Sequence, residues 1–324
     1  MTSHARALRR RILTPNLSET KVEVRGFHAK NAAARELLET IGETFLAGYA
    51  FAVEAKGHED AVRRLAGIPT RFRGFAYEGA AMGFAVLDAL PFGRSTNVSR
   101  FLAGAGAQHV YMAYVGVGWA MARVPRFRFR RLAMPDPLLR WLALDGYGFH
   151  QAYFKTDQYV RAAYQDPAFP WPGGGPRSYV NRAIDQGIGR ALWFVCGTAA
   201  ERVADTINGF PEHRRADLWS GAGLAATYAG GADEDELRSF LRRAGRYRAQ
   251  VAQGSAFAAA ARVRAGLVVP HVGAATTVLC GLTPAEAAAL TDERRPEGPD
   301  GEQLPAYELW RQRVANDLVA IGRN

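Results

Sequence analysis

The sequence has few of the residues and runs that define several large classes of protein. Its two cysteines, Cys196 and Cys280, lie outside any Cys-x-x-Cys pair, so no disulfide framework is expected and a reducing compartment is favoured. The longest runs of low charge, such as 110–122, are shorter than the roughly 20 residues of a membrane span. The basic segment 1–12 is not followed by an apolar stretch, which excludes a secretory signal. We therefore expect a cytoplasmic protein with no transmembrane segment.

The motifs of common catalytic classes are also missing. None of the seven histidines stands in a His-x-x-x-His or His-Glu-x-x-His spacing, which argues against zinc and di-iron centres. There is no Gly-x-Ser-x-Gly element, no phosphate-binding loop and no complete Gly-x-Gly-x-x-Gly fingerprint. Hydrolase and NTPase functions lose their usual support. No metal site is predicted, and the identity of any cofactor stays open.

Positive charge is abundant but dispersed. Lysine and arginine number 41 against 31 acidic residues, a net charge of +10, and only four of these cations are lysines. Such an arginine bias is typical of a GC-rich coding genome, and arginines cluster only at 9–11 and 126–131. In the second cluster, cations alternate with Phe127 and Phe129, a pattern that can stack on nucleic acid but that we interpret as a surface linker or edge strand. No nucleic-acid partner is expected.

The chain resembles itself when it is shifted by 142 positions. The paired positions include Leu65 and Ile207, Gly67 and Gly209, Pro69 and Pro211, Arg73 and Arg215, and Tyr77 and Trp219. Between the two copies, the segment 167–176 holds four prolines and three glycines, which exclude both a helix and a central strand. We predict an N-terminal arm (1–30), a first helical repeat (31–165), a Pro/Gly linker (166–177), a second helical repeat (178–295) and a C-terminal loop and helix (296–324).

Apolar residues recur at helical spacing through both copies, in Ala- and Leu-rich segments. Only 20–25, with alternating valines, predicts a strand. The fold class expected is all-α, with two tandem pseudo-twofold repeats of about five helices each forming a solenoid or toroid-like bundle. The helices are predicted at 33–55, 59–65, 72–87, 108–123, 137–154, 180–195, 199–207, 215–228, 235–262, 268–280, 284–290 and 307–321.

Glycine recurs inside these predicted helices, although each internal glycine costs about 0.5–1 kcal/mol relative to alanine. Pairs occur at Gly79 and Gly83, Gly116 and Gly118, Gly146 and Gly148, Gly187 and Gly189, and Gly221 and Gly223. One interpretation is close packing of helix backbones, because small residues let two helices approach. A second is that the glycines clear room for a ligand beside inward-facing polar residues. A dinucleotide loop is disfavoured because no strand precedes the pairs.

Polar and aromatic residues beside these glycines are the candidates for chemistry. Buried carboxyl groups with raised pKa values serve as general acids or bases, so Glu78, Asp145 and Asp185 are the candidate catalytic residues. Candidate substrate-binding residues are Glu43, Tyr77, His109, His150, Trp193, Trp219 and His271. The alternative for each histidine is a hydrogen-bonded core residue. The acidic run 233–236 could bind magnesium, but its place at a predicted helix start favours capping.

Five blocks resemble a known family when taken in order. They are Arg25-Gly-Phe-His28 with Arg35–Glu43, Arg73–Met82, Asp145–His150, Asp185–Phe194 and Arg214–Gly221. This combination resembles the UnbL-like family of unknown function, encoded in actinobacterial enediyne antibiotic clusters beside an iterative polyketide synthase. The resemblance implies a role in secondary metabolism, acting on a polyene or another polyketide-derived small molecule. It brings no assigned catalytic residue.

Two functions remain open at this point. In the first, an apolar pocket binds a long hydrophobic polyene and its carboxyl groups carry out acid–base chemistry without a cofactor. In the second, the protein is a non-catalytic binder or scaffold that shields a reactive intermediate or assembles other proteins of the same pathway. Carboxyl groups that converge on a cavity would favour the enzyme, and an apolar tunnel without titratable lining would favour the carrier.

Overall fold

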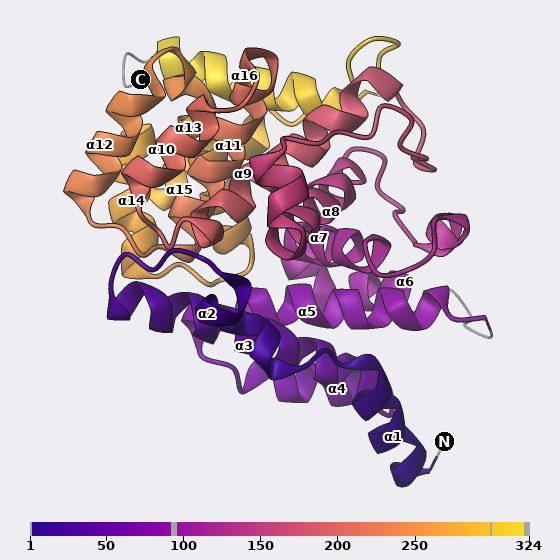
Figure 1. Cartoon of the computed structure of the whole chain (residues 1–324). Helices are drawn as coiled ribbons and strands as arrows, with labels where there is room; N and C mark the ends of the chain where they lie inside the picture. Colours follow the sequence, from indigo (N-terminus) through magenta and orange to yellow (C-terminus); the bar gives the residue numbers. More distant parts are fainter. Residues whose placement is uncertain (1, 92–95, 299, 321–324) are drawn as a thin grey trace.

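The computed structural model describes residues 2–91, 96–298 and 300–320, and every regular element in these ranges is helical (Figure 1). No helix of the described chain is long and apolar enough to cross a membrane. The α-helices are α1 (Ser3–Leu13), α2 (Val22–Arg25), α3 (Ala32–Glu54), α4 (His58–Ala66), α5 (Thr70–Ala89), α6 (Asn97–Ala103), α7 (Val110–Met121), α8 (Trp141–Phe154), α9 (Val180–Val195), α10 (Ala200–Asn208), α11 (Glu212–Ala229), α12 (Glu234–Ala244), α13 (Arg248–Arg264), α14 (Pro270–Cys280), α15 (Pro284–Glu293) and α16 (Ala306–Ala320). Shorter helical turns include η1 (Leu17–Thr20), η2 (Ala105–His109) and η3 (Arg126–Arg131).

The all-α class is confirmed, and most predicted helices lie within a few residues of observed ones. The predicted helix 235–262 is wrong as a single element, because Gly245 adopts a φ of +55° and separates α12 from α13. The predicted strand 20–25 is also wrong. Its residues end η1 and form α2, where the Val22 N–H donates to the Glu39 carboxylate at 3.1 Å instead of to a sheet. The cluster 126–131 forms the turn η3, and residue 321, the predicted end of α16, lies outside the described residues.

The predicted capping interaction is present at the start of α12, and a second one lies at the start of α15. Asp233 accepts a hydrogen bond from the Glu236 N–H at 2.9 Å, and the Glu236 side chain bonds back to Asp233. Thr283 and Glu286 form the same reciprocal box at α15. The acidic run at 233–236 therefore begins a helix, as the capping interpretation requires.

Seven long helices follow one another in a row, each packed against the next. The order is α3, α5, α7, α8, α9, α11 and α13, and α14, α15 and α16 pack against α13. Figure 1 shows α1–α4 on one side of the molecule and the orange and yellow helices of the second half on the other. Because neighbours in this row are close in sequence, most of the architecture comes from local pairs of helices.

Paired glycines allow this close stacking. On α8, a Cβ at Gly146 would stand 2.0 Å from the Val115 carbonyl of α7, and one at Gly148 would stand 2.0 Å from the Ile184 carbonyl of α9. Residues two apart are about 200° apart around a helix, so one glycine faces the preceding helix and the other faces the next. The same arrangement recurs along the row at Gly116 and Gly118, Gly187 and Gly189, and Gly221 and Gly223. Close backbone packing, the first interpretation of these glycines, is confirmed.

The row of helices curves, so that α11 and α13 near its end contact α5 near its start. Tyr228 of α11 packs against α5, where its hydroxyl would lie 1.9 Å from a Cβ at Gly74. Arg262 of α13 donates to the carbonyl oxygens of Arg71 at 3.0 Å and Tyr228 at 2.6 Å. The helices from α5 to α13 therefore surround an interior space, which is the setting of the candidate site.

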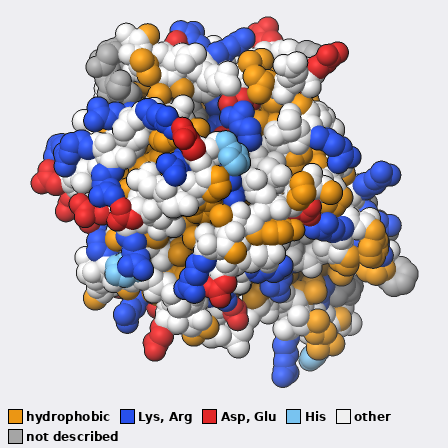
Figure 2. Space-filling model, turned by 45° about the horizontal axis from the view of Figure 1, so that its top comes forward, with side chains coloured by type: hydrophobic (Ala, Val, Ile, Leu, Met, Phe, Trp, Pro, Cys, Tyr) orange, Lys and Arg blue, Asp and Glu red, His pale blue; other side chains and the backbone are white. Residues whose placement is uncertain are grey.

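The remaining elements cover the two ends of this space. Near the N-terminus, η1 crosses α3 at Gly42, which lies directly under Thr20, and Lys21 pairs with Glu43 at 2.7 Å. Near the C-terminus, α16 inserts Arg311, which bonds Asp217 at 2.7 Å in the interior. On the face shown in Figure 2, basic and acidic side chains are interspersed, which matches the dispersed charge of the sequence.

Candidate functional site

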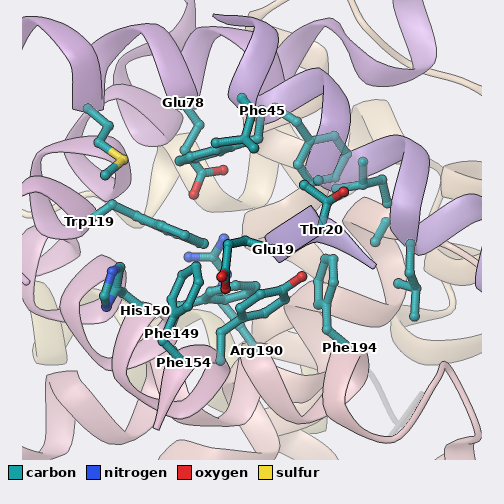
Figure 3. Close-up of a pocket in the computed structure, with 18 of the residues that line it drawn as sticks. Glu19, Thr20, Phe45, Glu78, Trp119, Phe149, His150, Phe154, Arg190 and Phe194 are labelled. Carbon is teal, nitrogen blue, oxygen red and sulfur yellow. The ribbon is translucent and has the colours of Figure 1, made fainter. Parts of the chain in front are cut away.

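The main cavity lies between α3, α5, α7, α8, α9 and α11, with η1 beside its mouth (Figure 3). It has a volume of about 70 Å³. Its walls are mainly apolar, and many of the lining side chains are aromatic. The rings that line it belong to Phe45, Phe75, Trp119, Phe149, Tyr153, Phe154, Phe194 and Tyr228.

A second, smaller cavity lies between α7, α8, α9, α11, α13, α15 and α16 and has a volume of about 40 Å³. Its lining shares Arg190, Leu224 and Tyr228 with the main cavity. Asp145 faces this second cavity. The Arg190 side chain therefore stands at the junction of the two spaces.

Arg190 and Asp145 form a buried ion pair at this junction. Both residues are at most 6% exposed, and the Arg190 Nη1 donates to the Asp145 Oδ1. The guanidinium also lies 5.3 Å from the centre of the Phe149 ring. Gly187 explains the pairing, because a Cβ there would stand 1.8 Å from the Asp145 carbonyl, so α8 and α9 touch where the two side chains meet. A buried charge of this kind needs a partner, and Asp145 supplies one.

Glu78 is the titratable carboxyl group of the main cavity. It is 3% exposed, its carboxylate points toward the centre of the space in Figure 3, and no hydrogen bond joins it to another residue of the described chain within normal geometry. Burial raises its pKa to about 7; Arg190 opposes this rise, and Asp145 adds to it. At neutral pH the group is therefore divided between its acid and carboxylate forms, the condition under which a carboxyl group both accepts and donates protons.

Unpartnered polar groups surround Glu78. Both ring nitrogens of His150 and the indole N–H of Trp119 are buried without a hydrogen-bond partner among the described residues. Burial lowers the pKa of His150 to about 3, so its ring is neutral at pH 7. The two rings meet edge to face, with centres 5.4 Å apart. Buried polar groups in proteins are rarely left without partners, so these atoms are available to a ligand.

Two of the other candidate carboxyl groups lie elsewhere. Asp185 does not line either cavity; it accepts hydrogen bonds from Arg214 at 2.6 and 3.0 Å and from Gln165 at 3.0 Å. Burial raises the pKa of Asp185 to about 6, against the effect of Arg214. Glu43 is part-exposed and pairs with Lys21 next to η1. In this structure both carboxyl groups fix parts of the fold.

The remaining candidates lie in the packed core outside the cavity linings. Tyr77 stacks on His109 with ring centres 3.6 Å apart, and burial lowers the pKa of His109 to about 4. The indole of Trp193 donates to the Gly230 carbonyl at 2.9 Å. Trp219 is fully buried, 5.0 Å from the ring of Phe240, and His271 lies 3.3 Å from the Tyr228 carbonyl. Of the ten candidate residues, the cavities are lined by Glu78, Asp145 and His150.

Sequence reasoning missed Arg190 and Trp119, which complete the surroundings of Glu78. A signal for Arg190 existed, because it is the only charged residue between Gln186 and Phe194, in a segment otherwise apolar and glycine-rich. Trp119 follows Gly118 directly, and glycine neighbours mark the inner faces of these helices. No group of His, Cys, Asp and Glu side chains within the described ranges is arranged to hold a metal ion.

These features define an all-α protein whose row of glycine-paired helices encloses an aromatic cavity with a buried acid and an ion pair. The chain belongs to the family described as "Protein of unknown function (DUF1702)", which matches residues 4–318. No curated protein and no solved structure matches it. Membership therefore extends over nearly the whole chain, and the function must be argued from the site.

Proposed function

We propose that the protein binds an elongated, conjugated apolar molecule in the main cavity and that Glu78 transfers a proton to or from it. The observation that carries this proposal is the Glu78 carboxyl group, buried among aromatic rings with a pKa of about 7. A structural carboxyl group in such a place would need hydrogen-bonding partners, as Asp185 has. Glu78 instead faces the cavity, where the Trp119 N–H opposes the rise of its pKa.

The walls suggest the kind of ligand. Aromatic side chains stack on flat π systems, and the cavity, with a volume of about 70 Å³, is lined by eight such side chains. A ligand longer than a few atoms requires side chains such as Phe154 and Leu46 to move at the mouth. The resemblance to UnbL-like proteins of enediyne clusters supports a polyene or a related polyketide-derived molecule.

The surrounding residues support proton transfer. The Glu78 carboxylate removes a proton from a carbon beside the conjugated system, and the resulting carboxylic acid returns a proton to a nearby carbon of the same system within its reach, which shifts a double bond and needs no other reactant. Arg190, fixed by Asp145, stabilises negative charge on Glu78 and on the ligand. Neutral His150 and the Trp119 N–H offer polar contacts that orient the molecule.

Deuterium incorporation tests this proposal. The protein is incubated in D₂O with a conjugated polyene such as β-carotene fragments or a linear polyene hydrocarbon, and mass spectrometry measures deuterium in the recovered molecule. We expect incorporation with the native protein, loss of most of it in Glu78→Gln, and native behaviour in Glu59→Gln, an exposed glutamate on α4. Tight binding without deuterium would reject the proton transfer and leave a binding protein.

That binding protein is the second candidate function. It is favoured by the Arg190–Asp145 pair, in which Asp145 already neutralises the cation at the junction, and by walls that are mostly apolar. Such a cavity shields a reactive polyene from water, and other proteins of the same pathway would then collect it. Binding that survives Glu78→Gln with native affinity would support this reading.

We also propose that the chain is a tandem duplication with the boundaries predicted above. The bounds of α4 recur in α10 after 142 positions, and so does the first residue of α5 in α11. The Arg73 side chain donates to the Ile68 carbonyl at 2.9 Å, and its counterpart Arg215 donates to the Phe210 carbonyl at 2.7 Å. Superposing 32–121 on 180–264 tests this. We expect a low root-mean-square deviation between the matched Cα atoms and a rotation near 180° between the two segments. A high deviation would reject the repeat.

A further inference from the structure

We propose that the ligand of the main cavity is an amphiphile whose anionic head group is bound at the mouth by Arg123 and Lys155, with its apolar chain directed toward Glu78. This inference rests on the binding part of the proposed function and adds the class of ligand and its direction. It starts from the charges around the mouth, which the function proposed above does not use.

Arg123 is exposed, lies two residues after the end of α7 and lines the mouth. Among the described residues no ion pair or hydrogen bond engages the Arg123 side chain, whereas the Arg25 and Arg190 side chains near the cavity are paired. Its charge acts on side chains from two helices: it opposes the burial-driven rise in the pKa of Tyr49 on α3 and adds to the burial-driven fall in the pKa of His150 on α8. The guanidinium is therefore placed between these helices, at the entrance.

Lys155 supplies a second cation next to the cavity lining, although it does not itself line the cavity. It directly follows Phe154, the last residue of α8, whose ring lines the cavity (Figure 3). Its side chain is exposed, no ion pair or hydrogen bond engages it among the residues described, and its charge also lowers the pKa of His150. The C-terminal ends of α7 and α8 each carry a partial negative charge of about half a unit. This is less than the full positive charge of Arg123 or Lys155, so the net charge of the two helix ends with these side chains is positive.

The acidic groups near the mouth are already neutralised. Glu19, the carboxylate that lines the entrance, accepts from Arg25 at 2.8 Å. Glu39 and Glu43 both pair with Lys21, at 3.0 and 2.7 Å. The charges left without partners at the mouth are therefore those of Arg123 and Lys155, which suits a carboxylate or phosphate head group.

The deep end of the cavity has the opposite preference. There a single cation, Arg190, faces two acids, Glu78 and Asp145, and burial raises the pKa values of both carboxyl groups. A permanently ionised head group at this depth would lose its hydration, and the one cation there is already paired with Asp145. The head group therefore stays at the entrance, and the apolar chain occupies the aromatic interior.

Binding of a fluorescent polyene tests this assignment. The probe is cis-parinaric acid, a conjugated fatty acid, compared with its methyl ester, which has the same chain and no charge. We expect the acid to bind the full-length protein at least about tenfold more tightly than the ester, as charge-assisted contacts imply. The double variant Arg123→Gln/Lys155→Gln is expected to remove this preference without changing the affinity for the ester.

The control variant is Arg242→Gln, an exposed arginine on α12, away from the cavity lining, and it should retain the preference. Competition by dodecanoic acid and by dodecyl phosphate separates the two kinds of head group. If the native protein binds acid and ester equally well, the head-group site is wrong and the proposed binding stands. If neither probe binds, both the head-group site and the proposed binding fail.

Discussion

At the scale of single residues, Glu78 shows how burial alone prepares a group for chemistry. Its neighbours are rings and a paired arginine, so desolvation is the dominant influence on its proton. A raised pKa has a cost, because the unfolded chain ionises this carboxyl group near 4.5 while the folded protein resists ionisation until about 7. Glu78 therefore opposes folding at neutral pH, as active-site residues often do.

This cost predicts a pH-dependent gain of stability in Glu78→Gln. Below about pH 4.5 the carboxyl group is protonated in both states, so the variant and the native protein should be equally stable. As the pH rises toward 7 the native protein loses free energy of unfolding, and above 7 the variant should be more stable by on the order of 3 kcal/mol. Urea denaturation at a series of pH values measures the difference.

Glu59→Gln is the matched control and should follow the native protein at every pH, since that side chain is exposed. An advantage of Glu78→Gln that is the same at pH 4 and pH 8 would show that packing, and not the proton, causes it.

Asp185 represents the opposite case, a buried acid that stabilises the fold. Asp185→Asn leaves the guanidinium of Arg214 buried without a charged partner, and we expect a loss of about 3–5 kcal/mol in the free energy of unfolding. Glu234→Gln removes a partner of Arg238 at the exposed start of α12 and should cost less than about 1 kcal/mol. Chemical denaturation compares the two. Equal, small losses would contradict a stabilising role for Asp185.

At this scale the sequence identified candidates by type but not by position. Glu78, Asp145 and Asp185 share the same features in the sequence, being acids beside glycines in apolar helices. What separates them is the nearest arginine. Asp145 meets Arg190 and Asp185 meets Arg214, residues 45 and 29 positions away, and only the folded chain reveals which acid remains unpaired.

At the scale of helices, the glycine pairs carry a sharp prediction. A Cβ at Gly187 would stand 1.8 Å from the Asp145 carbonyl, an overlap that neither backbone can relieve without separating α8 from α9. Gly187→Ala should therefore lower the free energy of unfolding by about 3 kcal/mol or more. It should also disturb the Arg190–Asp145 pair, so binding of an apolar probe should weaken. Thermal melts and probe titration measure the two effects.

Gly273 on α14 provides the control, because a Cβ there would meet nothing within 4 Å. Gly273→Ala should stabilise the protein by about 0.5–1 kcal/mol through helix propensity. If Gly187→Ala and Gly273→Ala changed the free energy of unfolding in the same direction and by the same amount, the glycine pairs would not be needed for close packing.

Helix positions were predictable because apolar spacing and caps are local properties. The bounds of α9 were predicted to the residue, and the starts of α12 and α15 follow from their capping boxes. The break between α12 and α13 was missed, because a glycine inside an apolar helix looks the same whether it packs or turns. Only the positive φ of Gly245 distinguishes it from Gly254.

At the scale of the whole molecule, α16 ties the second half of the row together. Trp310 is 1% exposed, and its indole donates to the Thr291 carbonyl of α15 at 2.7 Å. Trp310→Ala should cost about 3–5 kcal/mol and enlarge the smaller cavity, which Trp310 lines. Leu309→Ala, on the exposed side of the same helix, should cost less than about 1 kcal/mol. Denaturation and dye binding to exposed apolar surface compare the variants.

Closure of the row was beyond prediction from the sequence. Contacts such as that between Arg262 and the Arg71 carbonyl join residues 191 positions apart, and neither residue carries a local sign of its partner. The expected solenoid or toroid-like bundle implied a cavity only in general terms. Which side chains point into the cavity depends on how far each pair of helices rotates, and small rotations add up along the row.

The order of the row has a consequence for synthesis of the chain. Each long helix from α5 to α13 docks on the preceding member of the row, through glycines that need no distant partner. Folding can therefore proceed from the N-terminus as the ribosome releases the chain, because most early contacts are local. The aromatic interior stays open to water until Tyr228 reaches α5 and α16 arrives. Of the helices that line the smaller cavity, α16 is translated after the others and completes it.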